Sequence, residues 1–257
     1  MLMRPGAEAV ALIASPAELP DVTPPPLGAE HALFLDFDGT LVAIAPTPSS
    51  IVVPPELPGL LNAASDRLGG ALAIVSGRPV HPLAKFLDGY GGIIIGQHGL
   101  EKRGIDGKIV QEPPQPGLDP IRHLFAEFAK THPGLNFEDK GVSVSLHFRQ
   151  APELAGQSRQ LARRAVIASV GRFRLLEGHG VVELLPKSAG KGHAVAACLA
   201  EPPFKGRIPV FIGDDRGDEP AFEAVNQRRG ISIRVGAGPS AARYRFETPD
   251  EVRAWLG

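Results

Sequence analysis

The chain contains little of several residue types, and each shortage excludes a class of protein. Its single cysteine, Cys198, cannot support an intramolecular disulfide framework and fits a reducing, cytoplasmic environment. The formal net charge of −1 argues against nucleic acid or an anionic membrane as the main partner. No apolar run approaches the roughly 20 residues of a transmembrane helix, and residues 7–14, interrupted by Glu8, are too short for a signal-peptide core. We therefore expect a soluble globular protein, and 257 residues suffice to bury a full core.

Two carboxylates follow directly after an apolar segment near the start of the chain. Residues 32–35 (ALFL) predict a buried strand, which ends at a turn formed by Gly39 and Thr40. Asp36 and Asp38 therefore lie at the end of the strand where open parallel sheets bind ligands. Asp36 is placed to attack phosphorus, while Asp38 can give a proton to the leaving oxygen and later accept one from water. An ordinary acidic turn is the alternative, but the pattern favours phosphoryl transfer.

The second predicted strand, 71–75, is followed by Ser76, Gly77 and Arg78. These residues supply a hydroxyl donor, a position for close backbone approach and a planar guanidinium, all of which suit phosphate binding. Gly39 in the first turn is a further candidate phosphate contact. By itself an SGR segment is also typical of an ordinary strand exit, and its position after DFDGT favours the phosphate site.

A third apolar strand, predicted over 209–213, ends in a cluster of four carboxylates: Asp214, Asp215, Asp218 and Glu219. Like charges this close repel one another unless a cation compensates, and hard oxygen ligands beside a phosphate site favour Mg²⁺. A solvated acidic loop is the alternative. The position at a strand end, which repeats that of Asp36, favours a metal site.

Lys191 lies at the predicted start of a helix over 192–200. A lysine there opposes the helix dipole, so a bound anion nearby would offset the unfavourable charge. We assign Lys191, and not Lys187, as the cation of the site, because a Lys-Gly pair stands directly before the helix. A solvent-exposed lysine is the alternative.

The pattern of predicted elements divides the chain into an arm, a core and an insertion. Residues 1–27, which end in a proline-rich segment, predict a flexible or extended arm. Strands and helices alternate over 28–103 and 185–257, whereas 104–184 predict hairpins and two helices. The predicted fold class is α/β, a doubly wound and mostly parallel sheet with an inserted α+β cap. The expected strands are 32–36, 71–75, 93–96, 135–139, 142–149, 208–212 and 230–235, and the expected helices are 56–68, 80–88, 120–130, 153–170, 192–200, 219–227 and 249–255.

Segment 142–149 of the predicted cap alternates between polar and apolar residues. This period of two places four polar side chains on one face of a strand and four apolar ones on the other. The polar face is either exposed to solvent or forms a roof over a sugar ligand, and both interpretations stay open. Glu138 and Lys140 precede this strand and share a face, and Glu183 ends a later hairpin. The polar residues of 142–149 are Ser143, Ser145, His147 and Arg149.

These segments together resemble the haloacid dehalogenase superfamily of magnesium-dependent phosphotransferases. The DxDGT motif of that superfamily matches residues 36–40, and its later motifs match Ser76, Lys191 and the cluster that begins at Asp214. The resemblance implies that Ser76 holds the phosphate and that Lys191 neutralises the phosphoryl oxygens and the nucleophile. It also implies a Mg²⁺ site, whose ligands would be the Asp36 carboxylate, the Asp38 backbone carbonyl, Asp214 and, directly or through water, Asp215 and Asp218.

A closer resemblance is to the trehalose-6-phosphate phosphatases, which show similar DFDGTL, GALAIVSGRP and HGLE segments. The likeness runs from about Pro24 to Trp255. It implies hydrolysis of trehalose 6-phosphate through a phospho-Asp36 intermediate, and functional pairing with a trehalose-phosphate synthase. His98 lies in the HGLE segment, and the alternative to a substrate contact there is a structural role for this histidine within the turn. The substrate contacts that the resemblance implies are Glu138, Lys140 and Glu183, with His98, His147 and Arg149 as neighbours.

The chain departs from that family at two positions. Gly217 stands where threonine is usual, which removes a hydroxyl near the acidic loop, and Phe148 stands where tyrosine is usual, on the apolar face. The alternatives within the fold are another sugar-phosphate phosphatase, acting on sucrose phosphate or mannosyl-phosphoglycerate, and a mutase. A non-catalytic sugar-phosphate sensor is the alternative outside enzymes. The intact nucleophile Asp36 argues against it, because a pure binding protein needs no nucleophile.

Overall fold

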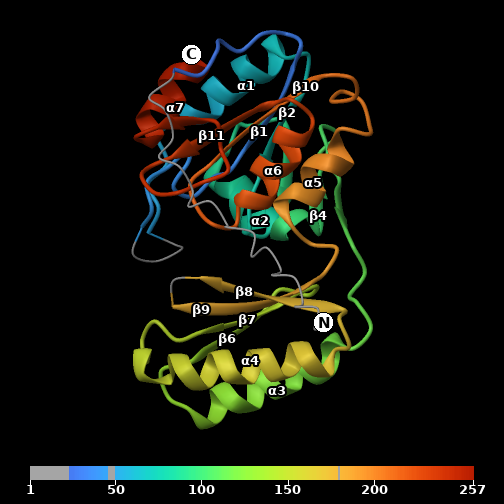
Figure 1. The fold of residues 1–257 in the computed structure, drawn as a ribbon, viewed down its shortest axis with the longest axis vertical. Helices are drawn as coiled ribbons and strands as arrows, with labels where there is room; N and C mark the ends of the chain where they lie inside the picture. The colour runs from blue at the N-terminus through green and yellow to red at the C-terminus, as the bar shows by residue number, and fades with distance from the viewer. Residues whose placement is uncertain (1–22, 46–49, 179) are drawn as a thin grey trace, which may run out of the picture.

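The computed structural model describes residues 23–45, 50–178 and 180–257, which form two β-sheets with helices around them (Figure 1). The larger sheet has eight strands in the order β12-β11-β10-β1-β2-β3-β4-β5, and the smaller sheet has four in the order β6-β7-β9-β8. Most of the predicted arm lies outside the described residues.

The elements have the following bounds. The larger sheet contains β1 (His31–Leu35), β2 (Leu72–Val75), β3 (Ile93–Gly96), β4 (Glu101–Arg103), β5 (Ile109–Gln111), β10 (Ile208–Gly213), β11 (Ile231–Val235) and β12 (Tyr244–Phe246). The smaller sheet contains β6 (Asn136–Asp139), β7 (Val144–His147), β8 (Phe173–Gly178) and β9 (Val181–Pro186). The α-helices are α1 (Leu57–Arg67), α2 (Val80–Phe86), α3 (Leu118–Thr131), α4 (Ala155–Ala168), α5 (Lys191–Cys198), α6 (Glu219–Gln227) and α7 (Pro249–Leu256), and short 3₁₀ helices cover Gln97–Gly99 and Pro152–Leu154.

The strands from β12 to β3 run parallel to one another, whereas β4 and β5 are added antiparallel at the β3 edge. From β1 the chain continues to β2 and β3 on one side of the sheet, whereas from β10 it continues to β11 and β12 on the other. Right-handed crossovers then place the connecting helices on opposite faces, so the sheet is doubly wound and its switch point lies between β1 and β10. Ligands bind in the crevice at the carboxyl ends of the strands at such a point.

Large aromatic residues hold β1 and β10 in the core. The ring of Phe34 in β1 stacks on Phe204 with 5.1 Å between centroids, and Phe211 in β10 meets Phe222 of α6 edge-on at 5.6 Å. Each such ring removes about 150–250 Å² of surface from water, so these two strands have little freedom to move relative to the sheet. The residues directly after them are therefore held in place.

The smaller sheet has α3 and α4 against one face and the larger sheet with its helices on the other side (Figure 1). Val144, Leu146 and Phe148 pack with apolar side chains of α3 and α4. On the opposite face Ser143 and Ser145 have no exposed surface. The polar face of β7 is therefore turned toward the larger sheet and is not a solvent-exposed face at these two positions.

Two elements differ from the sequence-based expectation. Strand β5 falls inside the predicted cap, 104–184, but it pairs with β4 in the larger sheet. Strand β12 was not predicted, because three residues at a sheet edge give too short a pattern. The division into 28–103, 104–184 and 185–257 stays a prediction. Among the described residues, no helix has the length and apolar character needed to cross a membrane.

Candidate active site

Three strand ends bring the predicted nucleophile, a predicted phosphate contact and a predicted metal ligand together at one edge of the larger sheet. Strand β1 pairs with β10 on one side and with β2 on the other, so Asp36, Asp214 and Ser76, which follow these strands, lie side by side. The backbone N–H of Asp36 donates to the Ile212 carbonyl at 2.9 Å, and that of Ser76 donates to the Ile95 carbonyl at 2.9 Å. The sheet hydrogen bonding thus continues up to these residues, at the switch point of the fold.

Lys191, the first residue of α5, joins two of the acidic residues. Its Nζ lies 2.7 Å from Oδ1 of Asp36 and 2.6 Å from Oδ1 of Asp218. Burial alone would lower the pKa of Lys191, but the charges of Asp218 and Asp36 raise it above its ordinary value. Lys191 is therefore a buried, permanently charged group beside the predicted nucleophile, and not a solvent-exposed lysine.

The site contains more negative than positive charge. Asp36, Asp214 and Asp218 each offer a carboxylate oxygen, and these atoms all lie within 4.8 Å of one another. Burial and the neighbouring carboxylates raise the pKa of Asp36 and of Asp214 to about 7 and the pKa of Asp218 to about 8, although Lys191 opposes this shift. One lysine cannot neutralise three carboxylates, so this donor set fits a divalent cation.

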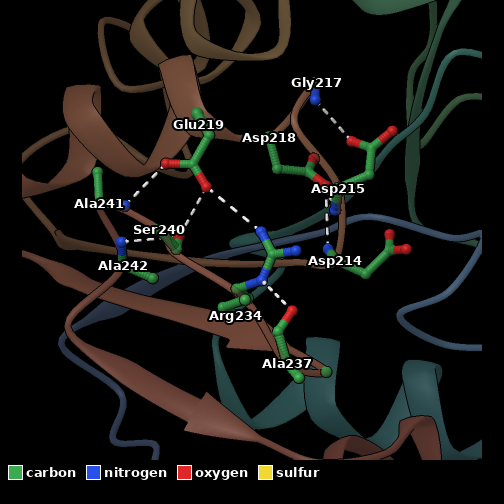
Figure 2. Close-up of polar contacts among 12 residues, drawn as sticks. Asp214, Asp215, Gly217, Asp218, Glu219, Arg234, Ala237, Ser240, Ala241 and Ala242 are labelled. Atoms are coloured by element: carbon green, nitrogen blue, oxygen red, sulfur yellow. Dashed lines mark hydrogen bonds and ion pairs between the residues drawn. The ribbon is translucent and has the colours of Figure 1, made fainter. Parts of the chain in front are cut away.

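Asp218 holds the loop that contains the acidic cluster (Figure 2). Its Oδ2 accepts the backbone N–H groups of Asp214 at 3.0 Å and Asp215 at 3.1 Å, and its side chain is fully buried. Asp215 is exposed, and its carboxylate accepts the N–H of Gly217 at 2.7 Å. Asp218 thus belongs to the buried acidic group, and the Asp215 side chain lies outside it.

Asp38 forms a bidentate ion pair with Arg78. Nε of the arginine lies 2.6 Å from Oδ2 of Asp38, and Nη2 lies 2.8 Å from Oδ1. The guanidinium carbon is also 5.9 Å from the centroid of the Phe37 ring and 5.3 Å from that of Phe86. These contacts fix the plane of the Asp38 carboxylate. The phosphate contact predicted for Arg78 stays a prediction.

Two glycines allow close approach within the site. Gly39 has φ +80°, and a Cβ there would lie 2.1 Å from Oδ2 of Asp214. A Cβ at Gly77 would lie 2.7 Å from Cε1 of His98, so the imidazole occupies the space that a side chain would need. Ser76, directly before Gly77, is 1% exposed. The two turns that the sequence assigns to phosphate binding are therefore closely packed against the acidic cluster and against His98.

Polar residues of the smaller sheet form a row on the face toward the larger sheet. Glu138 of β6 lies opposite Ser145 of β7, and Ser145 lies opposite Glu183 of β9. Because directly paired residues share a face, these three side chains lie together. Nζ of Lys140 is 3.0 Å from Oε1 of Glu183, and Oγ of Ser143 donates to the same oxygen at 2.8 Å. The structure thus brings Glu138, Lys140 and Glu183 to one place.

The Glu183 carboxylate is buried and contacts three protein side chains, those of Lys140, Ser143 and His98. Burial would raise its pKa, but the contact with His98 and the charge of Lys140 lower the pKa of Glu183 to about 2. Nε2 of His98 lies 3.7 Å from Oε2 of Glu183. Because His98 follows β3 and Glu183 lies in β9, this side-chain contact connects the two sheets.

The other predicted substrate contacts are more exposed to solvent than Glu183. Nε2 of His147 lies 2.9 Å from Oε2 of Glu138, and this hydrogen bond is the main cause that lowers the pKa of Glu138 below its ordinary value. Both side chains are about one-third or more exposed, at 33% and 42%. Arg149, beyond the end of β7, is exposed. His147 is thus grouped with Glu138, while Arg149 lies at the surface.

Two arginines near the site are not among the predicted site residues. Arg174 of β8 is partly buried, and its Nε and Nη2 each donate to the Ala189 carbonyl at 3.2 Å, close to the start of α5. Arg234 of β11 lies 3.4 Å from Oε1 of Glu219, next to the acidic loop (Figure 2). Both arginines lie in strands that otherwise consist mainly of apolar residues. A charged residue within such a strand is the sequence signal that marks both positions.

Comparison with known proteins agrees with this geometry. Residues 34–250 match the family model described as trehalose-phosphatase. The chain is 38% identical over 234 residues to the trehalose-6-phosphate phosphatase of Escherichia coli strain K12, an alignment that covers 90% of this chain and 87% of the relative. It is 40% identical over 205 residues to a probable trehalose-phosphate phosphatase of Sinorhizobium fredii, and this alignment covers 80% of this chain and 77% of the relative. The chain belongs to the trehalose-phosphatase family.

A solved structure supports the same fold. The C-terminal domain of the trehalose-6-phosphate phosphatase of Candida albicans superposes with a TM-score of 0.75 at 20% identity, over 91% of this chain and 97% of that domain. At this identity the likeness shows the fold alone. Membership of the trehalose-phosphatase family makes the chain a phosphatase, a phosphoric monoester hydrolase, and argues against a non-catalytic sugar-phosphate sensor.

Proposed function

We propose that the protein hydrolyses trehalose 6-phosphate to trehalose and phosphate through a phosphoryl group carried on Asp36. The observation that supports this most directly is the pairing of two sites across the molecule. Asp36, Lys191 and the acidic cluster lie at the switch point, and the row that contains Glu138 and Glu183 faces them from the smaller sheet. One site suits a phosphate ester and the other suits a sugar with many hydroxyl groups.

The chemical steps follow from the two carboxylates of the DFDGT turn. An oxygen of Asp36 attacks phosphorus and the bond from phosphorus to the sugar oxygen breaks, while protonated Asp38 donates its proton to that oxygen. Asp38 then accepts a proton from a water molecule, which attacks the phosphorus and releases phosphate from Asp36. Lys191, 2.7 Å from Asp36, offsets the negative charge throughout. Arg78 holds the ionised Asp38 carboxylate through both oxygens, so one of these two hydrogen bonds must open when Asp38 carries the proton.

The residues present fit a Mg²⁺ ion. Asp36 and Asp214 retain carboxylate oxygens for it, whereas Asp218 already accepts two backbone N–H groups and Lys191. We therefore assign Asp36 and Asp214 as the main side-chain ligands, and Asp218 as the residue that holds the loop. When bound, the cation would supply charge neutralisation for the phosphate ester. The contribution of the Asp38 backbone carbonyl and of Asp215 stays a prediction.

The cytoplasmic location and the pairing with a trehalose-phosphate synthase belong to the same proposal. The single, buried Cys198 supports a reducing environment. A synthase is the class of enzyme that makes the substrate.

A phosphate-release screen across trehalose 6-phosphate, glucose 6-phosphate, sucrose phosphate and mannosyl-phosphoglycerate tests the substrate directly. A preference for glucose 6-phosphate would refute the trehalose assignment, and isomerised sugar phosphate without phosphate release would indicate a mutase.

Replacement of the polar row tests sugar recognition. Glu138→Ala and Lys140→Ala are each expected to lower kcat/KM for trehalose 6-phosphate roughly tenfold to a hundredfold, because an unpaired sugar hydroxyl costs about 1–3 kcal/mol. A small aryl phosphate lacks these hydroxyls, so its kcat/KM should change by less than about threefold. Steady-state kinetics on both esters measures the difference. Glu127→Ala, an exposed residue of α3 on the far side of the sheet, is the matched control. Parallel losses on both esters would contradict a role in sugar recognition.

Asp38→Asn tests the proton transfer. The asparagine keeps the size of the side chain but cannot give up a proton to the sugar oxygen. We expect turnover of trehalose 6-phosphate to fall by roughly 10²–10⁴-fold. An activated aryl phosphate needs no protonation of its leaving group, so its loss should be smaller, and single-turnover phosphorylation of Asp36 measures this step. Equal losses on the two esters would count against Asp38 as the general acid.

A further inference from the structure

His98 contacts both catalytic segments of the larger sheet through its backbone. Its N–H donates to the Ser76 carbonyl at 3.0 Å, and its carbonyl accepts the N–H of Gly190 at 2.7 Å. Gly190 directly precedes Lys191. The residue therefore connects the predicted phosphate loop to the start of the helix that bears the buried lysine.

The His98 backbone has an unusual conformation, and its ring is tightly placed. Its φ is 58° and its ψ is 31°, in the left-handed region that non-glycine residues rarely adopt. The ring lies against the α-carbon of Gly77, where a Cβ would come within 2.7 Å of Cε1. The side chain is 11% exposed. A shift of the imidazole toward Gly77 would therefore displace the phosphate loop, because no free space separates them.

The same edge of the imidazole, Cε1 and Nε2, also faces the smaller sheet. Nε2 faces Oε2 of Glu183 at 3.7 Å, and Oε1 of Glu183 is held by Lys140 and Ser143. Glu183 is only 8% exposed in its side chain. A sugar hydroxyl that binds Glu183 must therefore adjust a carboxylate whose free movement is limited by three protein groups.

We propose that His98 is a positioning residue that couples the sugar contact at Glu183 to the phosphate loop at Ser76 and to the position of Lys191. The proposal rests on the proposed function and adds to it. When a hydroxyl of the disaccharide binds Glu183, this contact then increases kcat as well as the affinity for the substrate. This is a use of remote binding energy for alignment of the reacting groups.

The test variant is His98→Gly. Glycine adopts a φ of 58° without strain, so both backbone hydrogen bonds of this position are kept while the imidazole is removed. We expect kcat for trehalose 6-phosphate to fall about thirtyfold with KM changed less than about threefold, and kcat for a small aryl phosphate to fall only about threefold. His98→Asn, which tolerates the same φ and offers an amide donor, should recover part of the loss. His123→Ala, an exposed histidine on α3, is the matched control.

A double-mutant cycle decides whether the coupling exists. The combination of His98→Gly with Glu183→Gln should lower kcat for trehalose 6-phosphate by no more than about twofold beyond the more severe single variant. Fully additive losses, a change in KM alone, or equal losses on both esters with a lower melting temperature would each overturn the proposal. If the wild-type protein prefers another sugar phosphate, the substrate assignment fails, and the same cycle on that ester still decides whether His98 couples the two sites.

Discussion

Asp36→Asn is expected to reduce phosphate release from every ester at least about 10⁴-fold while leaving the fold intact. The amide has the shape of the carboxylate but cannot accept a phosphoryl group. Lys191 keeps its second partner, because its Nζ lies 2.6 Å from Asp218. Steady-state kinetics measures the loss, and calorimetric titration should still detect binding of trehalose 6-phosphate. Acid-quenched wild-type protein should contain a phosphoryl group on Asp36 that mass spectrometry can locate.

The matched control is Asp66→Asn, an exposed acidic residue of α1, which should retain full activity and the same melting temperature. A phosphoryl group found on a different residue would refute Asp36 as the nucleophile. Substantial turnover by Asp36→Asn, confirmed free of wild-type protein and of deamidated product, would refute it as well.

Removal of divalent cations is the second prediction with a very large effect. Asp36, Asp214 and Asp218 meet a dianionic phosphate with one lysine to balance them, so the metal-free protein should bind the ester poorly. EDTA is expected to lower turnover by roughly 10³-fold or more, and added Mg²⁺ should restore it. Mg²⁺ should also raise the melting temperature of the metal-free protein, since a ligand that binds only the folded state stabilises it.

Asp214→Asn provides the matched comparison for the metal. It removes one of the two assigned side-chain ligands, so the increase in melting temperature with Mg²⁺ should shrink and the Mg²⁺ concentration required for activity should rise. Asp66→Asn, an exposed residue of α1 outside the site, should leave both quantities unchanged. Undiminished phosphate release from protein shown to be metal-free would contradict the assigned site.

Most of the regular elements could be predicted from local patterns. The predicted bounds of strand 93–96 and helix 219–227 match the structure, because an isoleucine run between glycines marks the strand, and Glu219 and Pro220 mark the start of the helix. The pairing of β5 with the larger sheet could not be predicted, because a hairpin has the same local pattern whichever sheet it joins. The location of Ser143 and Ser145 was also open, since alternation identifies a polar face but not what lies opposite it.

Local motifs are enough to predict the chemistry. Two carboxylates after a strand, a Ser-Gly-Arg turn, a lysine at a helix start and an acidic cluster predict phosphoryl transfer, because each motif needs only neighbouring residues. Which of these groups contact one another depends on the complete fold. The fold brings Asp218 into contact with Lys191 and two backbone N–H groups. It also pairs Arg78 with Asp38 and brings His98 next to Glu183 across the two sheets. The physical reason is that distance, burial and net charge at a point depend on strand order and sheet packing, which bring together residues far apart in the chain.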